Sequence, residues 1–165
     1  MGLITRLKRL SLLAASAVVA ACSTAFPPAV PEAPPADKTR SCTPVAADEP
    51  LVGNWLNKRQ QQGVMGEIRT LFTLQADGRM LYTEQIKRPR QPSQGLNESG
   101  CWWRDGDQLV LHTTQSNGLE VDLDDPIYIN NYRITHSSSD KLRLRSLEGV
   151  EYQTERTSPG YRLPF

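Results

Sequence analysis

The sequence predicts an all-β domain, a small antiparallel up-and-down β-barrel of seven or eight strands. Apolar and polar residues alternate with a period of two in several short segments, and glycine-containing turns separate these segments. No sustained helical periodicity follows the first 21 residues. A meander of this many strands favours closure into a barrel, because closure removes exposed strand edges.

The expected strands follow one another along the chain. Turn signals separate three pairs of them: Gln75–Gly78, Asp105–Asp107 and Asn117-Gly118. Residues 56–62 are compatible with one short helical turn. The alternating segments are Glu67–Leu74, Met80–Glu84, Cys101–Trp103, Leu109–Thr113, Leu119–Leu123, Ile127–Thr135, Lys141–Arg145 and Val150–Glu155.

Residues 1–21 are typical of a secretory signal. Three basic side chains precede the apolar run 10–20, which is too short to span a membrane as a stable helix. Small residues then lead to Cys22, and this pattern resembles a bacterial lipobox. The resemblance implies cleavage before Cys22, its acylation and stable membrane anchoring; Ser23 after it implies the outer membrane. The alternative is an ordinary signal peptide followed by a free thiol.

Residues 22–50 are predicted to be a tether, and residues 51–165 the folded domain. The tether has seven prolines and no glycine. This composition cannot build a core and favours an extended polyproline II spacer. A proline-rich ligand for the groove of a partner protein is the alternative.

Two cysteines remain if Cys22 is acylated, and export would place both in an oxidising compartment. We therefore expect a disulfide between Cys42 and Cys101, clamping the end of the tether to the domain. A redox or metal site is the alternative. It lacks support, because the sequence contains no C-x-x-C motif and no cluster of histidine and cysteine.

The opening of the domain resembles that of lipocalins and related calycins. Gly53-Asn54-Trp55 has their G-x-W form, and Arg156 stands in the last expected strand. The ordered pieces of the match are Leu51–Trp55, Asp77-Gly78, Gly100–Trp102, Gly106–Leu111, Tyr132–Ile134, Asp140–Leu144 and Arg156.

The resemblance covers residues 51–157 and implies roles for the signature residues Gly53, Trp55 and Arg156. Trp55 would plug the closed end of a barrel, and Arg156 would stack on it. A binding role for a small apolar ligand or a lipid is also implied. The domain is shorter than a typical lipocalin, and barrels of this size can fill their interior with side chains.

Charge and motifs argue against several function classes. Residues 51–165 carry 14 basic and 14 acidic side chains, without the basic excess of a nucleic-acid binder. His112 and His136 accompany no activated-serine motif, so we expect no enzyme, cofactor or metal. The acidic run Asp122–Asp125 suits Ca²⁺ or an ordinary solvated face.

Two further segments are candidates for partner contacts. Lys87, Arg88 and Arg90 open a basic connection expected to run about 13 residues, to Ser99. It suits an acidic protein surface or anionic headgroups, or is simply a mobile solvated loop. The apolar C-terminal tail, residues 158–165, either covers the barrel or docks onto a partner.

Two functions remain. The first is a non-enzymatic binding module for a small apolar ligand or a lipid, anchored in the outer membrane. The alternative is a protein–protein module: an envelope or secretion-system accessory factor, or a hydrolase inhibitor. Bacterial lysozyme inhibitors use a Ser-Gly loop, and Ser99-Gly100 is present here, although Cys101 replaces the tyrosine that follows it in that family.

Overall fold

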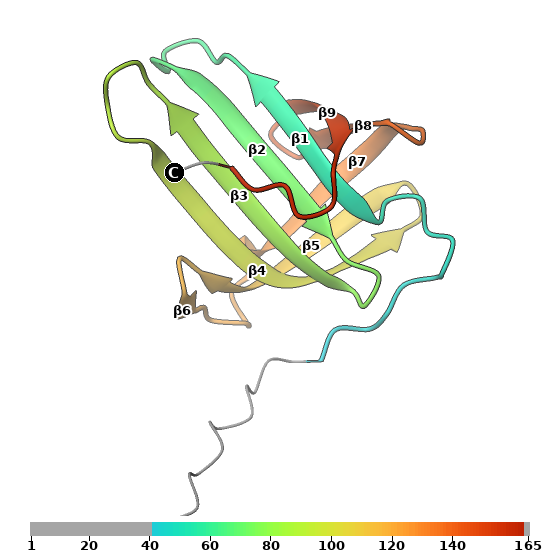
Figure 1. The fold of residues 1–165 in the computed structure, drawn as a ribbon. Coiled ribbons are helices and arrows are strands. Elements are labelled where there is room, and N and C mark those ends of the chain that lie inside the picture. Colours follow the sequence, from blue (N-terminus) through green and yellow to red (C-terminus); the bar gives the residue numbers. More distant parts are fainter. Residues whose placement is uncertain (1–40, 164–165) are drawn as a thin grey trace, which may run out of the picture. The chain divides into compact units, whose positions relative to one another are not determined.

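The computed structural model describes residues 41–163, which form an antiparallel β-barrel (Figure 1). The predicted signal sequence, Cys22 and most of the predicted tether lie outside the described residues. Within the described part, no helix has the length and apolar character needed to cross a membrane. The elements are β1 (Gly53–Arg59), β2 (Glu67–Leu74), β3 (Arg79–Lys87), β4 (Gln94–Asp105), β5 (Gln108–Ser116), β6 (Leu119–Glu120), the 3-10 helix η1 (Pro126–Tyr128), β7 (Ile129–Ser137), β8 (Lys141–Ser146) and β9 (Glu151–Thr157).

Eight strands close the barrel as a meander. Strands β1 to β5 pair in sequence order, β7 pairs with β5, and β8 and β9 follow. Pairing between β9 and β1 completes the ring. The short β6 pairs only with the end of β5 and stands outside it. The predicted fold class, an all-β antiparallel up-and-down barrel, is confirmed.

The barrel encloses one apolar core, because alternate residues of each strand point inward. Burial of each such side chain contributes about 1.5–3 kcal/mol before entropy is counted. A compact unit spanning Lys38–Phe165 contains all of these strands and the whole core. The core residues are Leu51, Trp55, Phe72, Leu74, Met80, Tyr82, Trp102, Leu109, Leu111, Tyr132, Leu142, Leu144 and Tyr152.

One end of the barrel, where β1 begins and β9 ends, is closed by Trp55. Its ring is fully buried, and its indole Nε1 donates a hydrogen bond to the Leu51 carbonyl at 2.8 Å. Arg156, opposite Trp55 in the β1–β9 register, places its guanidinium carbon 4.1 Å from the centre of that ring. A cation–π contact of this kind stabilises by about 0.5–2 kcal/mol.

The same guanidinium ties three chain segments together. It donates hydrogen bonds to the carbonyls of Val52 at 2.7 Å and Pro50 at 3.0 Å, and also to the carbonyl of Ser139. Gly53 has a φ of 145°, and a Cβ atom there would lie 2.2 Å from Arg156 Nη1. The glycine of the G-x-W motif therefore leaves room for the arginine.

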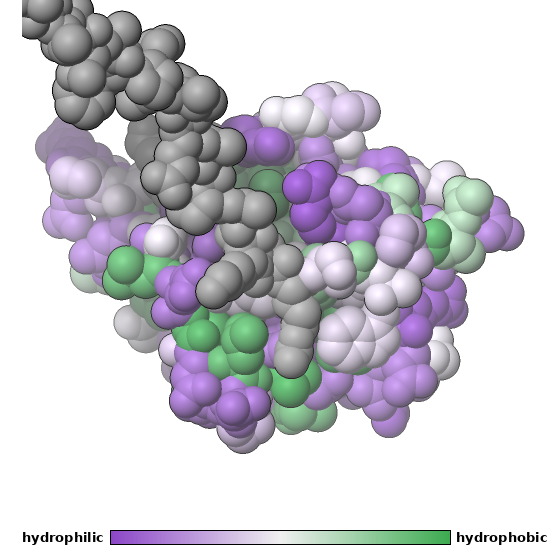
Figure 2. Space-filling model, turned by 90° about the horizontal axis from the view of Figure 1, so that it is seen from below, coloured by the Kyte–Doolittle hydropathy of each residue, from purple (hydrophilic) through white to green (hydrophobic). Residues whose placement is uncertain are grey.

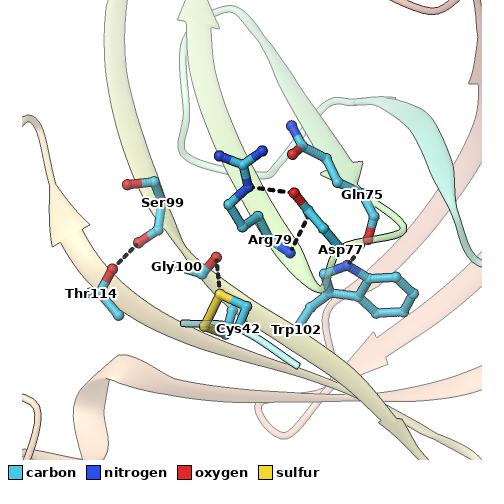
Figure 3. The surroundings of a disulfide bond; sticks show 9 residues. Cys42, Gln75, Asp77, Arg79, Ser99, Gly100, Trp102 and Thr114 are labelled. Carbon is cyan, nitrogen blue, oxygen red and sulfur yellow. Dashed lines mark hydrogen bonds and ion pairs between the residues drawn. A yellow bond between two sulfur atoms is a disulfide. The ribbon is translucent and has the colours of Figure 1, made fainter. Parts of the chain in front are cut away.

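The predicted disulfide between Cys42 and Cys101 joins the chain before β1 to β4 at the closed end (Figure 3). The cysteines are 59 positions apart, and closing a loop of that length stabilises the fold by about 4 kcal/mol on the chain-entropy model. Gly78, with a φ of 80°, lets the incoming chain pass closely, because a Cβ there would lie 2.1 Å from the Thr43 carbonyl oxygen. The end of the predicted tether is thus part of the folded unit.

Three expectations about local structure are wrong. The basic connection is short, residues 88–93, because β4 begins at Gln94 and pairs with β3 from there on. Only Leu119–Glu120 of the expected strand 119–123 is paired, and the Leu119 side chain is 74 % exposed. Residues 56–59 belong to β1 rather than to a helical turn, since all four pair with β2 and residues 56 and 57 also pair with β9.

The C-terminal tail crosses the outside of the barrel over β2 and β3 (Figure 1). Leu71 faces outward on β2 and is only 2 % exposed, while Leu163 of the tail is 3 % exposed. The Asn54 amide also binds the Ser158 carbonyl, where the tail begins, at 3.0 Å. The described part of the tail therefore covers the barrel wall.

We predict that Arg156→Ala lowers the free energy of unfolding of unit Lys38–Phe165 by about 2 kcal/mol, because the stacking and the carbonyl bonds are lost together. Urea unfolding followed by tryptophan fluorescence measures the change. The matched control Arg143→Ala removes an exposed arginine from the neighbouring β8 and should have almost no effect. Equal effects of the two substitutions would contradict this role of Arg156.

Candidate functional site

The barrel end opposite Trp55, here called the mouth, has a polar interior. The connections β1–β2, β3–β4, β5–β7 and β8–β9 all lie at this end. Polar side chains replace the apolar ones at the inward positions nearest the mouth. They are Asn57, Arg59, Thr70, Glu84, Glu98 and Thr113.

A layer of four aromatic rings separates the mouth from the apolar core. Phe72 contacts the rings of Tyr82, Tyr132 and Tyr152 edge to face, with ring centres 5.2, 5.6 and 5.5 Å apart. Tyr132 and Tyr152 also meet edge to face, at 5.6 Å. Burial raises the pKa of Tyr82 and of Tyr132 well above the usual range, so both hydroxyls stay protonated. The layer is a rigid floor under the mouth.

Glu84 is the centre of a hydrogen-bonded cluster on this floor. One carboxylate oxygen accepts hydrogen bonds from the Thr70 hydroxyl at 2.9 Å and the Tyr82 hydroxyl at 3.0 Å. The Arg59 guanidinium reaches the same oxygen at 3.3 Å and lies 5.4 Å from the centre of the Tyr152 ring. The charge of Glu84 is therefore compensated within the barrel.

Glu98 stands opposite Tyr82 in the β3–β4 register and lacks such compensation. Its nearest polar contact is the Thr113 hydroxyl at 3.4 Å, and within residues 41–163 it forms no ion pair. Burial raises the pKa of the Glu98 carboxyl, and the charge of Glu84 raises it further. A carboxyl in this setting is available to a ligand.

A cavity of about 580 Å³ opens above the aromatic layer. This volume lies within the range of small-molecule sites. Tyr82, Tyr132 and Tyr152 line its base together with Glu98, and residues 126–131 form one side. Turn β8–β9 contributes Leu147 and Glu148 at the rim. The arrangement can hold a small molecule with one polar group and one apolar part.

The basic residues singled out in the sequence lie at the mouth but not in this cavity. Lys87 and Arg88 line a separate depression between the β1–β2 and β3–β4 connections, and the Arg88 guanidinium binds the Met65 carbonyl at 3.1 Å. Arg90 is exposed and has a φ of 59°. None of the three forms an ion pair with a described residue.

The structure does not bring the other candidate residues together. His112 is half-buried on β5, where its Nε2 has no hydrogen-bond partner among the described residues, and His136 is exposed on β7. The carboxylates of Asp122 and Asp125 accept backbone hydrogen bonds that shape the segment before β7. No group of three or more potential metal ligands is found in residues 41–163. Ser99-Gly100 lies at a bulge inside β4 rather than in a loop.

Sequence reasoning missed the polar cluster, although one signal for it was present. Glu84 continues the inward alternation of Met80 and Tyr82, and a charged residue at an inward position predicts either strain or function. The alternation of inward residues does not reveal Glu98, because the sequence predicts a loop for its segment. Nor does it reveal Arg59, because residues 56–62 are compatible with a helical turn, which has no inward alternation.

Comparison with known proteins gives a structural likeness but no related sequence. No protein-family model matches the chain, and no curated protein matches it. A solved structure, that of the Cpx pathway activator NlpE from Escherichia coli, is similar to 68 % of this chain with 19 % sequence identity and a TM-score of 0.39. The match spans 49 % of the NlpE chain, about half of its length.

We predict that Glu98→Gln stabilises the protein at about pH 8 and not at about pH 3. The raised pKa means that the folded state holds this proton more tightly than the unfolded chain, so ionisation costs stability once the pH exceeds the ordinary value of 4.5. Glu98 is half-exposed, which limits the gain to about 2 °C in the thermal midpoint.

Calorimetry of the unsubstituted protein and of Glu98→Gln between about pH 3 and about pH 8 measures the change in thermal midpoint. The control Glu155→Gln removes an exposed carboxylate from β9 and should leave the midpoint unchanged at both pH values. A lower midpoint for Glu98→Gln at about pH 8 would show that the carboxylate stabilises the barrel, contrary to this reading.

Proposed function

We propose that the protein is a lipid-anchored, non-enzymatic binding module of the outer membrane, with a small ligand held at the mouth of its barrel. The export signal and Cys22 support the anchor. The cavity above the aromatic layer carries the proposal of ligand binding. A concave site of this size, in which apolar and polar side chains meet at the open end of a barrel, is the usual arrangement of a small-molecule site.

The filled core supports a ligand site at the mouth rather than in the barrel interior. Trp55 and Trp102 are 0 and 1 % exposed and occupy the closed end, and Leu111 packs among them rather than facing open space. The volume left for a ligand is at the mouth, where polar and apolar side chains meet. The sequence leads us to expect a small apolar ligand or a lipid, and we propose that the ligand carries a polar group beside its apolar part.

The arrangement of side chains supports binding rather than catalysis. The Glu84 carboxylate is occupied by three donors, and the two histidines lie on different strands away from the cavity lining. Catalysis needs an activated nucleophile or a positioned acid–base pair. Glu98 and Glu148 supply charge for binding at the cavity.

We predict that unit Lys38–Phe165, purified gently from periplasm without detergent, carries extra mass in native mass spectrometry that disappears on denaturation. Asn130→Trp, at the start of β7, fills the cavity and should abolish the extra mass. The control Asn97→Trp, on the outer side of β4, should keep it. A bare polypeptide mass for the unsubstituted unit would contradict ligand binding.

The alternative function, a protein–protein module, has one observation in its favour. Met65, Leu119, Ile127 and Leu147 project from three connections at the mouth and are 70–83 % exposed. Large apolar side chains at a protein surface often mark contact sites. On the face seen in Figure 2, hydrophobic groups stand as separate patches in a mostly hydrophilic surface. The basic residues Lys87, Arg88 and Arg90 adjoin Met65 at the same end.

If this alternative holds, reversing Lys87, Arg88 and Arg90 to Glu should abolish capture of an envelope protein in a pull-down. The matched control reverses Lys141, Arg143 and Arg145 on β8 and changes the net charge equally. Capture lost only with the first variant would favour the alternative over the ligand-binding function. Capture that survives the first variant would exclude the basic connection from any partner contact.

A further inference from the structure

The cavity at the mouth is acidic. Glu98 and Glu148 are among its lining residues, which include no lysine or arginine. Glu84 lies below them and already has Arg59 as its counter-ion. The two carboxylates that face the cavity therefore have no cation of the described chain beside them.

The connection between β5 and β7 extends this negative charge to the rim. Residues 117–130 include four acidic side chains and no basic one, and all four are exposed. Part of this connection, from Pro126 on, forms one wall of the cavity. Negative charge along this side of the mouth attracts cations before any contact is made. The basic residues Lys87 and Arg88 lie at the same end but line a separate depression.

The base of the cavity suits a cation as well as the rim does. Three tyrosine rings lie there, and aromatic rings attract ammonium groups. The Arg59 guanidinium already lies 5.4 Å from the centre of the Tyr152 ring, which leaves Tyr82 and Tyr132 for a ligand. The Tyr132 hydroxyl has no hydrogen-bond partner in the described part of the chain and stays protonated. Ile127 and Leu147 are 70 and 79 % exposed at the rim and offer apolar surface at the entrance.

We infer that the mouth binds a primary organic ammonium ion with a short apolar body, and that Glu98 is its counter-ion. This inference rests on the proposed function and names the ligand class. The ammonium group donates hydrogen bonds to the Glu98 carboxylate and to the oxygen of Tyr132. The apolar body lies toward Ile127 and Leu147.

The cost of partly burying the Glu98 carboxylate supports its role as the counter-ion. A carboxylate that is withdrawn from water without a partner destabilises the fold, and a bound cation offsets that cost. The two other partly buried carboxylates around the mouth form ion pairs: Glu84 with Arg59, and Glu67 with Arg69 at 2.6 Å. Within the described residues Glu98 has the Thr113 hydroxyl at 3.4 Å but no ion pair, and it is the partly buried carboxylate that lines the cavity.

Isothermal titration of unit Lys38–Phe165 with three probes of equal length tests the inference. Hexylammonium should bind at least about tenfold more tightly than hexanol, and hexanoate should not bind. Glu98→Gln, which we expect to fold stably, should weaken hexylammonium binding at least about tenfold. The control Glu155→Gln, remote from the cavity, should leave the affinity unchanged.

Equal affinity for hexylammonium and hexanol, or an unchanged affinity in Glu98→Gln, would overturn the inference. Absence of binding by all three probes would also overturn it. If native mass spectrometry then shows a bound neutral or anionic molecule, the proposed function stands and only the ligand class is wrong. If a lysine-containing peptide binds and hexylammonium does not, the cation belongs to a protein partner, and the small-molecule assignment fails.

Discussion

The stacking of Arg156 on Trp55 connects the two ends of the sheet, and the rest of the barrel depends on that connection. The two residues face each other across the β1–β9 pairing, which closes the ring. The carbonyl bonds of the same guanidinium fix the chain before β1 and the β7–β8 turn. The disulfide secures the incoming chain at the same end. Because these contacts stabilise the barrel at its closed end, the mouth can contain polar residues that a ligand reaches.

The closed end is held by stabilising contacts, whereas the mouth contains a carboxylate that lowers stability. Glu84 is held by an arginine, a tyrosine and a threonine, which compensate its partial burial. Glu98 lacks such a set of partners, and its raised pKa is the sign of an uncompensated cost. Proteins keep groups of this kind where function requires them, since replacement by a neutral side chain would stabilise the fold. The carboxylate that weakens the barrel is thus the one most suited to binding.

Local patterns in the sequence predicted the architecture well and the site poorly. Period-two alternation and turn residues placed β2, β3, β5, β8 and β9, because each of these strands has one apolar and one polar face. The same signal failed at β4, where Gln94–Ser99 are mostly polar and are held by pairing with β3, a contact between distant residues. It failed again at 119–123, where the alternation continues but only Leu119–Glu120 form a strand, paired with the end of β5. Glu98 lay in the first of these segments, so its place in a cavity depended on pairing that the sequence alone does not reveal.

The central claim is that a ligand binds at the mouth and leaves the closed end unchanged. A nuclear magnetic resonance titration of ¹⁵N-labelled unit Lys38–Phe165 with hexylammonium tests it most directly. The account predicts saturable shifts of the backbone amides of Glu98, Tyr132 and Leu147, with the indole N–H signals of Trp55 and Trp102 unmoved. Shifts centred on those indoles, or spread evenly over the barrel, would contradict a site above the aromatic layer.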